Sequence, residues 1–176
     1  MTVPRKLRLV LLMCLLVCTV GCDQTSKHIA RTGLSQVDSV TLPGGFGELR
    51  LAENPGSFLS LGALLSETAR LAIFTYGVGV GLVVLFAYLT GCVQIHLVRF
   101  IGLSLLVAGG MSNLLDRILR HGLVTDFVMI QVGPFRTGVF NLADVIIMIG
   151  ISVMFWTFRR RTLSSGPTSR MQRTPR

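Results

Sequence analysis

Four long stretches without a charged residue constrain this chain more than any other feature of its sequence. They cover residues 9–22, 71–98, 100–115 and 145–158. A helix that crosses a bilayer needs about 20 mostly apolar residues, and each stretch reaches that length once its flanking turn is included. Only 14% of the 176 residues are charged, whereas a soluble domain carries about 25%. The sequence therefore predicts an all-α integral membrane protein with four transmembrane helices.

The distribution of basic residues predicts how these helices are oriented. With four spans, both termini and the short loop that contains Arg99 lie on one side, which carries a net charge of +10, whereas the other side carries −1. By the positive-inside rule this side is cytoplasmic and the two longer loops are extracytoplasmic. We expect residues 1–161 to form one membrane domain and residues 162–176 to form a basic, disordered cytoplasmic tail that contacts anionic lipid. Because the basic residues follow topology, we expect no nucleic-acid partner.

The N-terminus allows a second interpretation. Basic residues and an apolar run precede Thr19-Val20-Gly21-Cys22, as in a lipoprotein signal peptide whose cleavage would make Cys22 the first residue. Two features favour an uncleaved first helix instead. Thr19 stands where a larger aliphatic residue is usual, and three further spans would follow the cleavage site.

The first extracytoplasmic loop, at about residues 28–67, has strand character. Residues 39–42 and 48–51 flank the turn Pro43-Gly44-Gly45, which predicts an antiparallel hairpin. Residues 123–132 and 135–140 flank Gly133-Pro134 and predict a second, weaker hairpin. We therefore expect a small extracytoplasmic β-sheet above the four helices.

Polar side chains gather where the helices meet the extracytoplasmic surface. Polar groups near a bilayer are costly unless they are paired, so such a cluster is a functional hypothesis. Asp23 and Lys27 are four residues apart and can pair on one helix face. Arg117 follows Asp116 directly, and we expect these two to form a structural ion pair. The other members of the cluster are Asn54, Asn113, Asp126, Asn141 and Asp144.

Asp126 and Asp144 have no obvious basic neighbour in the sequence. Two carboxylates without counter-ions can share one proton, and such a pair acts as general base on water and as general acid on a leaving amine. Asp144 could instead only cap the fourth helix. A transporter or proton channel that uses Asp116, Asp126 and Asp144 as a relay also remains open. The histidines and cysteines show no metal-ligand spacing, so we expect no metal and no cofactor.

Five sequence motifs in order carry a family resemblance. They are Asp23-Gln24-Thr25-Ser26-Lys27, Asn54-Pro55-Gly56, residues 109–117 (GGMSNLLDR), residues 122–127 (GLVTDF) and residues 140–144 (FNLAD). With these motifs on four predicted spans, the chain resembles lipoprotein signal peptidase (signal peptidase II), a bacterial inner-membrane aspartic protease.

The resemblance implies a function and a set of site residues. Asp126 and Asp144 would be the catalytic pair of an aspartic endopeptidase at the extracytoplasmic face. It would cleave diacylglyceryl prolipoproteins on the N-terminal side of the lipidated Cys, without a metal, and we expect it to act as a monomer. A non-catalytic scaffold for lipoproteins is a further alternative. The residues expected to line or brace the site are Asp23, Lys27, Asn54, Gly56, Asn113, Asp116, Arg117, Asn141 and Ala143.

The chain departs from the family pattern at three places. Ser57 alone precedes Phe58, where the family often has a pair of small residues. Ser112 stands where a Gly often precedes the Asn of the third motif, and Thr125 stands where a Val is usual. We expect these departures to affect loop geometry and substrate preference rather than activity.

Overall fold

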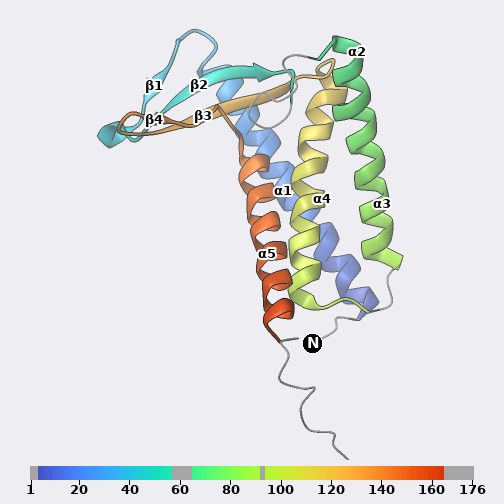
Figure 1. Ribbon diagram of the computed structural model, residues 1–176. Helices are drawn as coiled ribbons and strands as arrows, with labels where there is room; N and C mark the ends of the chain where they lie inside the picture. Colours follow the sequence, from blue (N-terminus) through green and yellow to red (C-terminus); the bar gives the residue numbers. More distant parts are fainter. Residues whose placement is uncertain (1–3, 57–64, 92–93, 165–176) are drawn as a thin grey trace, which may run out of the picture.

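Four helices that are long and apolar enough to cross a membrane run side by side in the computed structural model, which describes residues 4–56, 65–91 and 94–164 (Figure 1). The prediction of a mostly helical, multi-pass membrane protein is confirmed. The first span is α1 (Arg5–Gly33), and the second is formed by α2 (Glu67–Arg70), a π-helical segment η3 (Leu71–Gly77) and α3 (Val78–Gly91). The third is α4 (Leu97–Leu119), and the fourth lies in α5 (Leu142–Ser164).

Helix α4 lies at the centre of the bundle, where it contacts α1, α3 and α5. Its contact with α5 is close: a Cβ atom on Gly109 would lie only 2.7 Å from the carbonyl oxygen of Ala143. Glycine at this position therefore lets the outer end of α4 approach the start of α5, as small residues do in membrane helix pairs. An apolar core lies nearer the other end of the bundle and contains Leu12, Leu89, Ile95, Phe100 and Val107.

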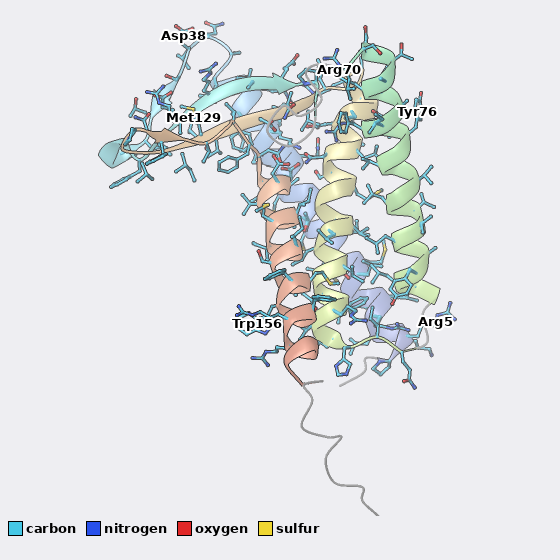
Figure 2. The ribbon with its side chains drawn as sticks, in the orientation of Figure 1. Arg5, Asp38, Arg70, Tyr76, Met129 and Trp156 are labelled. Carbon is cyan, nitrogen blue, oxygen red and sulfur yellow. The ribbon has the colours of Figure 1, made fainter. Side chains whose placement is uncertain are left out.

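The outer surface of the bundle is apolar, as expected for contact with lipid. Val80 and Val83 on α3 and Phe155 on α5 are exposed large apolar side chains. Trp156 on α5 lies at the end of the bundle away from the sheet (Figure 2), and the guanidinium of Arg160 stacks over its ring at 4.9 Å. Aromatic and basic side chains of this kind are typical of the level where a helix leaves the bilayer.

The four strands form one antiparallel sheet in the order β1-β2-β3-β4. Their bounds are Val40–Thr41, Gly47–Asn54, Val124–Val132 and Phe135–Arg136. Both predicted hairpins are confirmed as β1-β2 and β3-β4. The sequence did not predict that β2 pairs with β3, which joins the two hairpins into one sheet. The sheet lies across the end of the bundle opposite Arg5 and extends sideways beyond α5 (Figures 1 and 2).

Two helices continue beyond the limits expected for the first loop and the tail. The first loop was expected to begin near residue 28, but α1 continues to Gly33, because the polar residues that end its apolar stretch find partners on α4 and α5. The tail was expected to begin at residue 162, but α5 continues to Ser164. The rest of the predicted tail, residues 165–176, and the departure at Ser57 and Phe58 lie outside the described residues.

Candidate active site

A fully buried ammonium group lies at the base of the polar cluster. Lys27 Nζ is 2.6 Å from Asp23 Oδ2 and 3.0 Å from Asp116 Oδ2, and it donates a hydrogen bond of 2.9 Å to Asn113 Oδ1. The predicted Asp23–Lys27 pair is therefore present. One positive charge is shared by two carboxylates from different helices, which ties α1 to α4 beneath the sheet.

The predicted ion pair between Asp116 and Arg117 does not form within the part of the chain that the structure describes. The Asp116 carboxylate accepts hydrogen bonds from the Gln24 side chain at 3.0 Å and the Thr125 backbone N–H at 3.1 Å, in addition to its contact with Lys27. Successive helix residues point about 100° apart, so Arg117 faces a different direction. The charge that acts on it most strongly is that of Asp144, followed by that of Asp126.

Two buried amide side chains connect Lys27 to the predicted catalytic pair. Because an ammonium group can only donate, the oxygen of Asn113 must face Lys27, and its Nδ2 then donates to Asp144 Oδ1 at 2.9 Å. Asn141 Nδ2 donates to the same Asn113 oxygen at 3.1 Å and to Asp126 Oδ1 at 2.7 Å. The orientation of both amides is thus determined by Lys27.

The structure brings Asp126 and Asp144 to the same residue, Asn141, from different elements. Asn141 donates its side-chain N–H to Asp126 and its backbone N–H to Asp144 Oδ2 at 3.1 Å. Asp126 comes from β3 and Asp144 from the first turn of α5, where its own N–H donates to Asn141 Oδ1 at 3.0 Å. Asn141 therefore caps α5 and Asp144 reciprocates by accepting the Asn141 backbone N–H, so Asp144 takes part in the cap, while its other oxygen, Oδ1, accepts a hydrogen bond from Asn113 within the cluster.

The protonation of Asp126 is set by burial and by neighbouring groups. Burial raises the pKa of the Asp126 carboxyl to about 6, and the negative charge of Asp144 acts in the same direction. Hydrogen bonds from Asn54, at 2.9 Å to Oδ2, and from Asn141 oppose this rise, as does the positive charge of Lys27. A carboxyl group with a pKa in this range can both hold and release a proton in mildly acidic to neutral water.

The remaining predicted site residues brace this arrangement. Asn54, at the end of β2, accepts the backbone N–H of Gly56 at 3.0 Å, which fixes the amide that donates to Asp126. Ala143 is fully buried, and its N–H donates to Asp23 Oδ1 at 2.9 Å. Asp23 on α1 therefore holds the start of α5, the helix that carries Asp144.

A family model described as signal peptidase (SPase) II matches residues 15–160 of this chain. The chain belongs to the signal peptidase II family. The lipoprotein signal peptidase of Moorella thermoacetica is 36% identical over 83% of this chain and 89% of its own length. The enzyme of that name from Desulforapulum autotrophicum is 33% identical over 78% of this chain and 84% of its own.

Solved structures agree with this assignment at the level of the fold. One bacterial membrane enzyme superposes with a TM-score of 0.74 at 24% identity, covering 94% of both chains. A second has a TM-score of 0.72 at 25% identity and covers 84% of this chain and 91% of its own. The family resemblance and the fold expected from the sequence are confirmed, and this signal peptidase II family member is a peptidase.

Three residues that sequence reasoning did not select hold the cluster together. Gln24 donates to Asp116, Thr125 donates its backbone N–H to the same carboxylate, and Ser112 donates to Asp23 Oδ2 at 2.6 Å. Ser112 and Asp116 are four residues apart on α4, and this spacing was the available signal. At Ser112 the departure from the family pattern therefore adds a hydrogen bond to a buried carboxylate, a bond that contributes about 1.5–3 kcal/mol.

Among the described residues, no group of three or more His, Cys, Asp or Glu side chains is arranged to hold a metal ion. The polar groups of the site are its carboxylates, its amides and two buried cations, Lys27 and Arg117. Together they form a polar cluster at the sheet end of the bundle.

Proposed function

We propose that this protein is an aspartic endopeptidase that removes the signal peptide from diacylglyceryl-modified prolipoproteins. The bond cut is the peptide bond on the N-terminal side of the lipidated Cys. Membership of the signal peptidase II family and relatives named lipoprotein signal peptidase support the substrate class. The observation that carries the catalytic assignment is that Asn141 donates hydrogen bonds to both Asp126 and Asp144.

In the proposed mechanism, Asp126 begins the reaction protonated and Asp144 begins it ionised. Asp144 accepts a proton from a water molecule whose oxygen attacks the scissile carbonyl carbon, while Asp126 gives its proton to the carbonyl oxygen. The resulting diol then collapses: the C–N bond breaks, Asp144 protonates the leaving nitrogen, and a diol hydroxyl returns its proton to Asp126. Each carboxyl group ends in its starting state, as general acid–base catalysis requires.

The position of the site suits a lipid-anchored substrate. The diacylglyceryl chains of a prolipoprotein remain in the bilayer, so its scissile bond is held near the membrane surface at the level of the sheet. Confining enzyme and substrate to one plane supplies proximity that a soluble protease must obtain from binding. We place this site at the extracytoplasmic face of the bacterial inner membrane, with both termini in the cytoplasm.

The proton-relay alternative is less well supported by the placement of the acids. A relay through the membrane needs ionisable residues along its depth. Asp116, Asp126 and Asp144 instead lie together at the sheet end, bound to the same two amides or to Lys27. We propose that the active form is a monomer, in which one chain supplies both Asp126 and Asp144.

The substrate assignment is tested with purified enzyme in detergent and two forms of one prolipoprotein. We expect cleavage before the lipobox Cys when that Cys carries diacylglycerol, and a rate at least about tenfold lower when it does not, since acyl-chain binding contributes to the reaction. Mass spectrometry of the released peptide identifies the bond. Equal rates for both forms, or cleavage at another bond, would contradict the proposed substrate.

A further inference from the structure

A groove of about 590 Å³ runs along the outer face of α5 toward the end of the bundle away from the sheet. Its volume is within the range of sites that hold small ligands. One side chain of α4 lines it, and the others come from α5, where they recur every three or four residues and so share one helix face. Its lower part, named here the Trp156 groove, is lined by Val98, Ile149, Ser152, Val153, Trp156 and Arg160.

The Trp156 groove is apolar along its length and basic at its end. The Ser152 hydroxyl donates to the Met148 carbonyl oxygen at 2.8 Å, so it is already paired within its own helix. At the end of the groove the Arg160 guanidinium lies 4.9 Å from the centroid of the Trp156 ring, which holds the charge beside the ring. Guanidinium N–H groups can only donate. An occupant that fits this groove therefore has an apolar body and an anionic acceptor at one end.

The acidic residues of the chain supply no counter-charge at this end of the bundle. The sequence has no Asp or Glu before Asp23, between Glu67 and Asp116, or after Asp144. The described helix ends that meet here, where Figure 2 labels Arg5 and Trp156, therefore carry basic residues and no carboxylate side chain. Basic residues at a membrane surface attract anionic lipid headgroups.

The length of the Trp156 groove fits an acyl chain of one leaflet. Arg160 lies eleven residues from Ile149, or about 16 Å along the helix, and half of the hydrocarbon core of a bilayer is about 15 Å thick. A chain whose headgroup lies beside Arg160 would therefore end near Ile149. A membrane-spanning helix needs about 30 Å, whereas the whole groove extends from Arg160 only to Val145, about 22 Å.

A second copy of this chain fits the same face less well. Two copies with the same orientation in one membrane that packed α5 against α5 would bring Arg159 and Arg160 of each copy close to those of the other. Like charges placed opposite each other disfavour such a contact, and neither helix end carries an acid that could compensate.

We propose that the Trp156 groove binds an acyl chain of an anionic phospholipid from the leaflet at the end of the bundle away from the sheet, with the lipid phosphate beside Arg160. Arginine binds phosphate oxygens through paired N–H donors. Arg159 lines an adjoining hollow of α5 that also includes Trp156, so it adds a second positive charge at the same level. This lipid site does not depend on the proposed catalytic function.

Trp156 reports on this site directly because it is the single Trp of the chain. The purified protein is reconstituted in phosphatidylcholine vesicles that contain a small, fixed share of phosphatidylglycerol. Bromine is carried by the acyl chains of either the phosphatidylglycerol or an equal amount of the phosphatidylcholine. Because bromine quenches Trp fluorescence only at short range, we expect brominated phosphatidylglycerol to quench Trp156 at least about twofold more strongly. Equal quenching by the two lipids would overturn the proposal.

Two double variants separate a defined site from general surface charge. Arg159→Gln/Arg160→Gln should abolish the preference for phosphatidylglycerol. Arg5→Gln/Lys6→Gln removes two charges at the same end of the bundle, on α1 (Figure 2), and should retain most of the preference. A preference that survives R159Q/R160Q, or one that both double variants lose equally, would contradict a headgroup site beside Trp156.

A further pair of variants tests the groove itself without any change in charge. Ser152→Phe fills the groove with a ring and should reduce the preference for phosphatidylglycerol at least about twofold, because the acyl chain loses the apolar surface that it covers. Val83→Phe, on an exposed position of α3, is the control and should behave as wild type. A wild-type preference in S152F would show that the acyl chain does not lie in this groove.

Discussion

Replacing Asp126 or Asp144 with Asn is expected to lower the rate of prolipoprotein cleavage by about a thousandfold or more in either single variant. Proton transfer by a positioned acid or base contributes about 10²–10⁴ in rate, and the members of a catalytic unit act together rather than additively. We therefore expect D126N/D144N to be no slower than the slower single variant. The measurement is the initial rate of signal-peptide release by purified enzyme in detergent.

Asn is close to Asp in size, so these variants test the carboxylate rather than the packing. Asp38→Asn, on the exposed loop at the outer edge of the sheet (Figure 2), is the control and should retain the wild-type rate. Unfolding of all variants should be compared to exclude loss of structure. If either D126N or D144N processed substrate within about tenfold of wild type, the assignment of that residue as catalytic would be wrong.

Replacing Lys27 with Met is expected to reduce the free energy of unfolding by about 3–5 kcal/mol, the usual loss when one partner of a buried ion pair is removed. The Asp23 and Asp116 carboxylates would remain buried without the ammonium group that lies 2.6 and 3.0 Å from them. Asn113 would also lose the donor that orients its amide toward Asp144. Unfolding in mixed micelles of a mild detergent and dodecyl sulfate measures the change.

Lys6 provides the control for this variant because it lies on the same helix but is exposed at its other end. Lys6→Met should change the free energy of unfolding by less than about 0.5 kcal/mol, as surface substitutions generally do. A K27M protein as stable as K6M would show that the two buried carboxylates do not depend on Lys27. The cluster would then need another source of charge compensation.

Local spacing predicted the contacts that are made within one element or one hairpin. Asp23 and Lys27 pair because residues four apart on a helix are neighbours. The β1-β2 turn followed from Pro43-Gly44-Gly45, since such residues favour tight turns. Hydropathy likewise predicted four spans, because each helix presents an apolar surface to lipid along most of its length.

Contacts between distant segments could not be predicted in the same way. Lys27, on another helix, contacts Asp116 in place of the adjacent Arg117, and nothing in the sequence ranks these two cations. The pairing of β2 with β3 and the orientation of the Asn113 amide also depend on segments that meet only after folding. The end of α1 was misplaced for the same reason: hydropathy falls at Asp23, but partners on α4 and α5 allow the helix to continue.

The most direct test of a proton-carrying Asp126 beside Asp144 is an infrared titration of the protonated carboxyl groups in the purified enzyme. The wild-type protein should lose one carboxyl C=O band as the pH rises through about 6. That band should be absent from D126N, and in D144N it should titrate at lower pH, because the negative charge of Asp144 raises the pKa of Asp126. An Asp126 carboxyl that titrates near its ordinary value of about 4, or one that is unaffected by D144N, would contradict the account.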